Sequence, residues 1–169
     1  MTSVFDFAAE IQARLGSVDA FRLNKLVYYV QAWSLAWRNR PAFHERIEAW
    51  RHGPVAKDLW VDITHHSSRQ LGNASRLSVD DLELVERVLI HYGQMSSDAL
   101  IKLTHAEEPW KKARGSLPAT AASSEEIPVH AMRDFYARAW REAQEDIEQN
   151  DAPPAFSGTV EEFEKFLGI

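Results

Sequence analysis

Apolar side chains recur at intervals of three and four residues along most of this sequence, and this spacing constrains the fold most. The clearest series lies in the last third of the chain and includes several bulky aromatic residues. Its members are Met132, Phe135, Tyr136, Ala139, Trp140, Ala143 and Ile147. Because an α-helix turns once every 3.6 residues, these side chains would share one face of one helix. The spacing predicts an amphipathic helix that buries this face.

The same spacing predicts further helices, separated by Gly and Pro residues at the positions where helices commonly end. These helices are expected at 4–15, 20–38, 54–67, 82–92 and 97–108, and a short one after Thr159. Within residues 43–50, Ile47 and Ala49 alternate with Glu48 and Trp50, which predicts a short extended piece. The segment 111–126 has the weak pattern of a loop. The predicted fold class is therefore all-α, a globular domain of about six to seven helices with at most a short β-hairpin near 43–50.

The composition excludes several classes of protein. A chain of 169 residues with six Trp and eight Phe can bury a substantial core, so one domain is expected. The absence of Cys excludes disulfides, thiolate zinc sites and thiol nucleophiles. The segment 1–15 carries acidic residues and resembles no secretory signal, and no apolar run reaches the length of about 20 residues that a membrane helix needs. We therefore expect a cytoplasmic protein without membrane contact.

Negative charge accumulates towards the C-terminus. The formal net charge is −6, and residues 142–169 contain eight acids and one Lys. Within that stretch, Asn150-Asp-Ala-Pro-Pro154 has the composition of a linker. We therefore predict a helical domain at 1–149, followed by a linker and a short acidic C-terminal helix at 150–169. The overall charge makes nucleic acid an unfavourable partner.

No residue pattern points strongly to catalysis or to a metal. His65 and His66 are adjacent, so on a helix their side chains would diverge by about 100°, and the other His residues lack the spacing of a metal motif. The seven Gly residues are isolated from one another, so there is no phosphate-binding loop and no Gly-x-Ser-x-Gly motif. We therefore predict no catalytic residue, no metal and no cofactor, and interpret the protein as a non-enzyme.

Two alternatives remain open at this stage. The series from Arg38 to His44 resembles the Arg-polar-x₄-His signature of helical ribonucleases, although Pro41 interrupts it at a helix end. The segment 82–105 has the length and the Gly93 turn of a helix-turn-helix, which would make the protein a DNA-binding regulator. The second helix of that segment carries Asp98 at the end that would meet DNA, and this acid opposes the phosphates.

The stretch Glu48-Ala-Trp-Arg-His-Gly-Pro-Val55 contains Trp50 and His52 next to Gly53-Pro54, which is typical of a tight turn. We expect Gly53 to adopt a backbone conformation that other residues resist and Pro54 to begin the next helix. Arg51 and His52 would then project from a rigid corner, where they either pair with Glu45 or Glu48 or face a partner.

This stretch and two others together resemble the SocA-like, or Panacea, antitoxin domain. The motifs that carry the resemblance are Leu23-Asn-Lys-Leu-Val-Tyr-Tyr29, Trp33, Phe43, Ile47-Glu-Ala-Trp-Arg-His-Gly-Pro-Val55 and Thr104-His105-x₃-Pro109-Trp110. The similar region covers about 20–140. Such a domain is expected to neutralise a toxin encoded nearby by direct protein–protein binding, or to deliver that toxin to a protease.

Within the similar region, the residues expected to contact the toxin are Tyr28, Arg51, His52 and Trp60. The short acidic helix of the tail either folds back on the core or contacts the toxin, with Phe163 and Phe166 as apolar anchors. Residues expected to be structural are Lys25, Glu48, Trp50, Gly53, Pro54 and Trp110.

Overall fold

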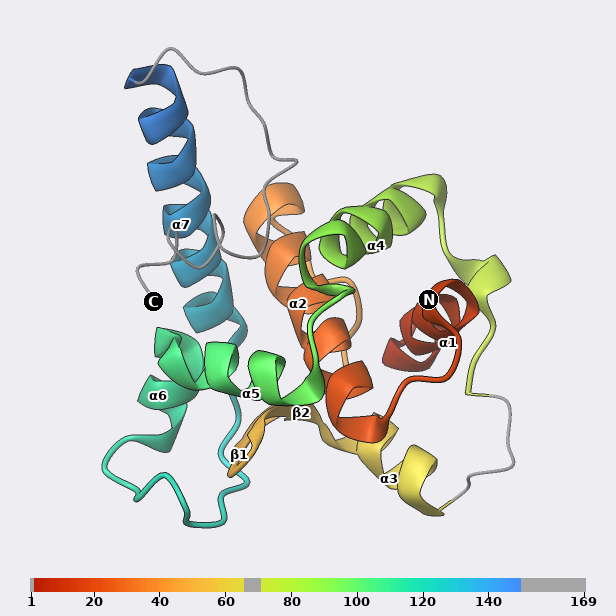
Figure 1. Ribbon diagram of the computed structural model, residues 1–169, viewed down its shortest axis with the longest axis horizontal. Coiled ribbons are helices and arrows are strands. Elements are labelled where there is room, and N and C mark those ends of the chain that lie inside the picture. Colours follow the sequence, from red (N-terminus) through yellow and green to blue (C-terminus); the bar gives the residue numbers. More distant parts are fainter. Residues whose placement is uncertain (1, 66–70, 150–169) are drawn as a thin grey trace.

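The computed structural model describes residues 2–65 and 71–149, and these residues form a mainly helical domain (Figure 1). In chain order the elements are α1 (Val4–Leu15), α2 (Ala20–Arg38), β1 (Ile47–Trp50), β2 (Gly53–Ala56), α3 (Lys57–His65), the 3-10 turn η1 (Ala74–Arg76), α4 (Val79–Tyr92), α5 (Ser97–Ala106), α6 (Glu108–Arg114) and α7 (Val129–Gln149). The predicted fold class, all-α with a short hairpin, is confirmed.

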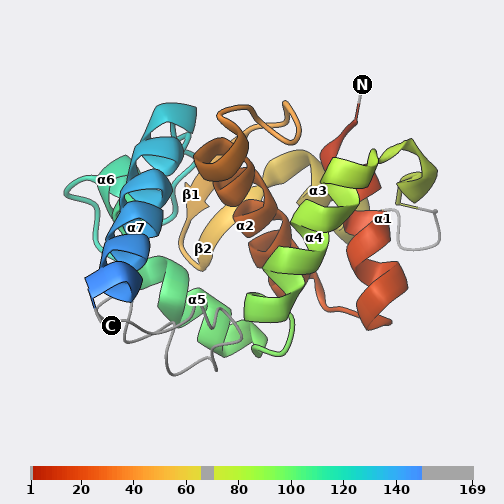
Figure 2. The ribbon, with the colours of Figure 1, turned by 90° about the horizontal axis from the view of Figure 1, so that it is seen from above.

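Helix α2 lies at the centre of the domain. Every residue from Leu23 to Leu35 is buried, because this helix is largely apolar around its whole circumference. Helices α1 and α4 lie on one side of α2 and α7 lies on the other, while α5 and the hairpin cover its remaining faces (Figures 1 and 2). The amphipathic stripe predicted on α7 packs on this central helix, with Met132 and Tyr136 fully buried.

Local sequence signals fix the helix ends. The side chain of Ser78 accepts from the backbone N–H of Asp81 at 3.2 Å, and the Asp81 carboxylate accepts from the backbone N–H of Ser78 at 3.2 Å, which together cap α4. Gly16 ends α1 with φ 76°, a backbone conformation that glycine adopts without steric cost. The helices predicted at 4–15, 20–38, 82–92 and 97–108 correspond to α1, α2, α4 and α5.

A two-stranded antiparallel hairpin follows α2, and the two-residue turn Arg51-His52 joins its strands. This corrects the helix predicted at 54–67, because Pro54 lies in β2 and α3 begins only at Lys57. The proline is tolerated because it pairs with Ala49 at a position where the backbone N–H groups point away from the partner strand.

Other parts of the chain cover both outer edges of the hairpin. On β1, the Ala49 N–H donates to the carbonyl of Glu125 and the Ile127 N–H donates to the carbonyl of Ile47, each at 2.8 Å. On β2, the Ala56 N–H donates to the side-chain oxygen of Asn24 at 3.1 Å. The hairpin is therefore fixed in the core rather than presented as an open edge.

The segment 111–126, predicted as a loop, needs a second correction. Its first residues belong to α6, where Pro109 occupies the first turn and Gly115 ends the helix with φ 56°. The helix predicted at 97–108 ends before Pro109, and this proline is consistent with a helix end. Pro is equally suited to begin one, because the first-turn N–H groups have no partner inside a helix.

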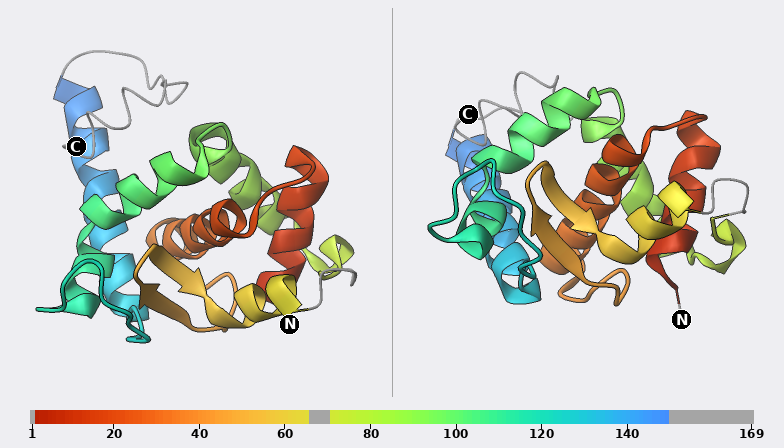
Figure 3. Two further views of the ribbon diagram at one scale, coloured as in Figure 1. Left: turned by 60° about the horizontal axis from the view of Figure 1, so that its bottom comes forward. Right: turned by 90° about the horizontal axis from the view of Figure 1, so that it is seen from below.

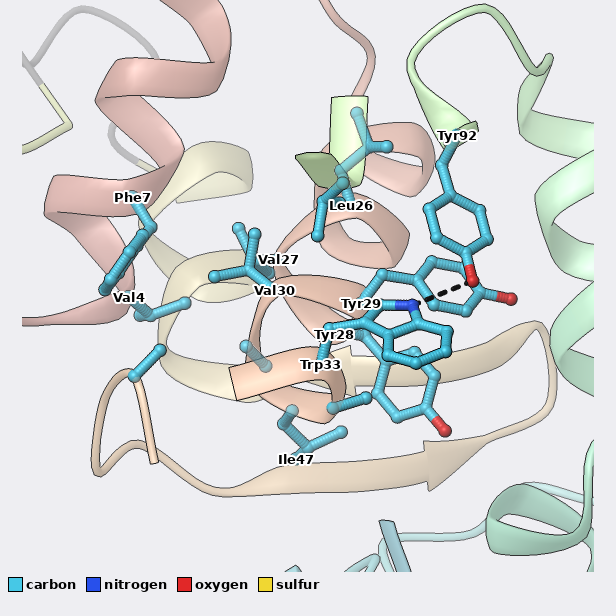
Figure 4. Close-up of a cluster of buried hydrophobic side chains, with 14 of the residues drawn as sticks. Val4, Phe7, Leu26, Val27, Tyr28, Tyr29, Val30, Trp33, Ile47 and Tyr92 are labelled. Carbon is cyan, nitrogen blue, oxygen red and sulfur yellow. Dashed lines mark hydrogen bonds between the residues drawn. The ribbon is translucent and has the colours of Figure 1, made fainter. Parts of the chain in front are cut away.

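Aromatic rings fill the core between α2, α4 and α7. The rings of Tyr29 and Tyr92 stack with centroids 3.8 Å apart, and the Trp33 indole donates to the Tyr92 hydroxyl at 3.0 Å (Figure 4). Near the hairpin, Phe7 from α1 packs on Phe43, with ring centroids 6.0 Å apart. The linker and acidic helix predicted for 150–169 lie outside the described residues.

Candidate functional site

The turn of the hairpin brings a group of aromatic and basic side chains together at the protein surface. We call this group the hairpin corner, and it consists of Phe21, Trp50, Arg51, His52 and Trp60. These residues line a groove of about 510 Å³, and Val55, Ala122 and Ser123 complete its walls. The corner draws on the first turn of α2, the hairpin and α3; Figure 3 shows the hairpin and α3 along one side of α2.

The rings of the corner contact one another while remaining partly accessible. The Phe21 ring lies 5.0 Å from that of Trp60 and 5.7 Å from that of His52, measured between centroids. Phe21 is 37% exposed, Trp60 is half-buried, and Arg51 and His52 are exposed. Three residues expected to contact a toxin, Arg51, His52 and Trp60, therefore meet in one place.

Gly53 and Lys25 set the position of the turn. Gly53 has φ 98°, and a Cβ atom there would lie 2.5 Å from Lys25 Cε and 2.7 Å from Thr104 Oγ1. Lys25 is fully buried beneath the turn, where its Nζ donates to the Pro54 carbonyl at 3.0 Å. This burial lowers the pKa of Lys25 to about 7. The close contact between Gly53 and Lys25 therefore fixes the backbone of the turn that carries Arg51 and His52.

Helix α6 holds the same turn from the other side. The Trp110 indole donates to the Trp50 carbonyl at 2.8 Å, and the ring of His105 stacks on that of Trp110 with centroids 4.1 Å apart. Arg114 lies over the Trp110 ring and donates to the Ala49 carbonyl at 3.0 Å. These bonds join α6 to the end of β1, which makes the corner rigid.

Glu48 anchors the ring of Trp50. The Glu48 side chain is buried, and its carboxylate accepts from the Trp50 indole N–H at 2.7 Å. We had considered Glu45 or Glu48 as partners for Arg51. Within residues 2–65 and 71–149, Arg51 forms no ion pair with either; its Nε lies 3.2 Å from His52 Nε2, and Glu45 accepts from the Val4 backbone N–H.

Tyr28, the fourth described residue expected to contact a toxin, does not belong to this surface. Its side chain is fully buried, and its hydroxyl lies 3.3 Å from that of Tyr136. Tyr28 belongs to the central helix, which is buried on all sides, so the structure does not present its side chain to a partner. Phe163 and Phe166 lie outside the described residues.

The Tyr28 network surrounds a buried carboxyl group. Glu107 accepts from Tyr136 at 2.5 Å and from Tyr29 at 3.1 Å, and burial raises the pKa of Glu107 to about 8. The same burial, together with the charge of Glu107, raises the pKa of Tyr28 well above its ordinary value. A carboxyl group enclosed in this way is a structural element between α2, α6 and α7 rather than an accessible acid.

The geometry does not favour the helix-turn-helix alternative. At the leading end of α5, the Ser97 hydroxyl donates to the Asp19 carboxylate at 2.6 Å, and Asp98 is exposed in the first turn. Two carboxylates therefore occupy the position where a recognition helix would meet phosphates and base edges, and they would repel DNA.

The ribonuclease alternative requires Arg38 and His44 to act on one phosphate, and the structure separates them. The Arg38 guanidinium pairs with Asp81 at 2.8 Å and lines a hollow with Trp37 and Arg87. His44 lines a different hollow. The two side chains therefore do not share a site.

In residues 2–65 and 71–149, no group of three or more His, Asp or Glu side chains is arranged to hold a metal ion. None of the helices in this part of the chain combines the length and apolar character needed to cross a bilayer.

Sequence reasoning missed Phe21, Ala122 and Ser123 as parts of the groove. Phe21 lies in the first turn of α2 next to Arg22 and close to Asn24, so an aromatic residue among polar neighbours at the start of a helix was the available signal. Ala122 and Ser123 belong to the segment after α6, and only the pairing of residues 125–127 with β1 brings them near the turn. No local pattern indicates that pairing.

Comparison with known proteins gives one match. No curated protein and no solved structure matches the chain. The model of the family described as antitoxin SocA-like, Panacea domain, matches residues 23–111, which span most of α2, the hairpin, and α3 to α6. This chain therefore belongs to the SocA-like antitoxin family and carries its Panacea domain.

Proposed function

We propose that this protein neutralises a cognate protein toxin by binding it directly, and that the hairpin corner is a contact surface for that toxin. The observation that carries the proposal is the antitoxin family match over residues 23–111, which includes four of the five corner residues. The toxin is expected to be the product of a neighbouring gene.

The physical character of the corner supports this role. Trp and Arg residues contribute most of the binding energy in many protein interfaces, and the corner presents both on one surface. Its backbone is held by buried bonds from Lys25, Trp110 and Arg114. A rigid contact surface loses little conformational entropy on binding, so more of the contact energy contributes to affinity.

A second contact is proposed for the acidic C-terminal segment, with Phe163 and Phe166 as apolar anchors. The net charge of −6 suits a toxin with a basic surface, because complementary charge accelerates association and favours the correct partner. Deleting residues 150–169 tests this contact. The shortened protein should melt at the temperature of the full chain but neutralise less well; a large fall in melting temperature would place the segment in the folded core instead.

Co-expression tests the proposal directly. Cells that express the neighbouring gene product alone should stop growing, and co-expression of this protein should restore growth and give a complex that survives gel filtration. Trp60→Ala should weaken rescue, whereas Ile90→Ala, which removes an apolar side chain 59% exposed on α4, should not. A toxic partner that is never rescued would contradict direct binding, and so would rescue in which the level of the partner is undiminished and no complex forms.

The same cells distinguish occlusion from delivery to a protease. If the protein occludes the toxin, the half-life of the toxin should stay constant or lengthen on co-expression. If the protein delivers the toxin for degradation, that half-life should shorten and rescue should require a protease.

A further inference from the structure

The charge of the groove at the hairpin corner is opposite to that of the whole protein. The chain carries a formal charge of −6, yet the groove lining contains Arg51, His52 and no carboxylate. Glu48, the acid closest in sequence to Arg51, is buried and directs its carboxylate to the Trp50 indole rather than to the groove. The groove is therefore an aromatic surface with a basic rim on an acidic protein.

Arg51 retains most of its capacity to bind an anion. It is exposed, and within the part of the chain that the structure describes it pairs with no acid; its one side-chain bond runs from Nε to His52. A guanidinium group has five N–H donors in a planar fork that matches a carboxylate. The outer edge of this fork is therefore free to receive one.

The part of the groove next to Arg51 is lined by aromatic rings and suits an apolar side chain. Phe21 and Trp60 meet edge to face, with ring centroids 5.0 Å apart, and the Trp50 ring lies 5.8 Å from that of Trp60. The volume of about 510 Å³ falls within the range of about 300–1,000 Å³ typical of binding pockets.

We propose that the groove receives a short segment of the toxin in which an apolar side chain stands next to a carboxylate. The apolar side chain packs against Phe21 and Trp60, and the carboxylate binds Arg51. This inference rests on the function proposed above and specifies which part of the toxin is recognised. A nucleic acid is the less suitable occupant, because one Arg on a chain of charge −6 neutralises few phosphates.

The test measures the affinity of the full-length chain for its toxin at about 0.1 M and about 1 M salt, where the screening length is about 10 Å and about 3 Å. Arg51→Glu should lower the affinity about 10- to 100-fold at the lower salt concentration and less at the higher one, as expected for a charge contact at an interface. Arg51→Lys should retain part of the affinity, since it keeps the charge but loses the fork.

Matched variants distinguish binding in the groove from effects of charge elsewhere on the protein. Arg87→Glu makes the same charge change on α4, on the far side of α2 from the hairpin, and should leave the affinity unchanged (Figures 1 and 2). Trp60→Ala should weaken binding at both salt concentrations. Ala122→Trp, at an exposed position, fills the groove without removing a contact and should weaken binding as well. An Asp or Glu of the toxin, changed to Arg, should restore binding to Arg51→Glu.

The outcomes separate the two proposals. If the wild-type chain neither binds nor rescues the toxin, the proposed function fails. If it does both while Arg51→Glu matches Arg87→Glu, or while Trp60→Ala and Ala122→Trp bind like wild type, only the groove inference fails. Tighter binding by Arg51→Glu would assign a basic segment to the groove, and binding that nuclease treatment abolishes would assign a nucleic acid; either result overturns the inference.

Discussion

Replacing Gly53 with Ala tests the contact that positions the hairpin corner. The new Cβ would lie 2.5 Å from Lys25 Cε and 2.7 Å from Thr104 Oγ1, so at least one of these buried side chains must move. Moving Lys25 would disturb its bond to the Pro54 carbonyl. The substitution therefore combines backbone strain at φ 98° with a collision in a packed interior.

The free-energy costs of the backbone strain and of the collision can both be estimated. An Ala residue in the left-handed region costs about 1–2 kcal/mol, and overpacking a core costs about 1–3 kcal/mol, so the free energy of unfolding should fall by about 2–5 kcal/mol. In a chain of this length each kcal/mol lowers the melting temperature by about 2–4 °C. Urea unfolding and calorimetry would measure the two quantities.

Gly16→Ala is a control for a positive φ without a collision, because Gly16 has φ 76° and nothing lies within 4 Å of its added Cβ. Both substitutions reduce the entropy of the unfolded chain similarly. Gly16 has ψ −145°, outside the left-handed region, so its loss gives the cost of backbone strain in a different conformation and not the strain at Gly53 itself. Lys25→Ala should relieve the collision, so Gly53→Ala should cost less in that background. An equal loss for Gly53→Ala in the wild-type and in the Lys25→Ala background would refute the reasoning.

Three further predictions concern the buried polar groups. Because burial raises the pKa of Glu107 from 4.5 to about 8, the folded chain binds this proton more tightly, and the Glu107 contribution to stability should fall as the pH rises from 4.5 to 8. In the Glu107→Gln variant, the free energy of unfolding should no longer decline in this way between pH 4.5 and 8. A pH profile of stability equal to that of the wild type would contradict this prediction. Because burial lowers the pKa of Lys25 from 10.5 to about 7, the unfolded chain binds that proton more tightly, and stability should rise between pH 7 and 10.5. Lys25→Met should flatten this rise, which pH-dependent calorimetry would reveal. Trp110→Phe removes the donor to the Trp50 carbonyl and should cost about 1–3 kcal/mol in urea unfolding, and no loss would show that water replaces the indole.

Helical periodicity located α1, α2, α4, α5 and α7, because each has enough turns to display its apolar face in the sequence. The two errors share a cause, since Pro has several favourable positions. Pro54 satisfies the rule for a helix start but lies in β2, where its missing N–H faces away from the partner strand. Pro109 satisfies the rule for a helix end but opens α6. Which position a proline takes depends on tertiary contacts that local sequence does not encode.

The candidate site was predictable only in part, and the reason lies in how its residues are assembled. Arg51 and His52 follow from the turn sequence, since a two-residue turn must expose its side chains. Tyr28 lies on a helix whose residues from Leu23 to Leu35 are all buried, and the contacts that cover its face come from segments far away in the sequence. Phe21 and Ser123 join the groove through contacts between segments far apart in sequence, which periodicity does not report.

Hydrogen–deuterium exchange of the protein alone and in complex with its toxin tests the central claim most directly. We expect slower exchange on binding in peptides that cover the hairpin (48–56), α3, and the segment 118–124, because these carry the groove. Peptides from α4, which lies across α2 from the hairpin, should exchange as they do in the free protein (Figure 2). Protection confined to α4, with none at the hairpin corner, would contradict the account and place the toxin on the opposite side of the molecule.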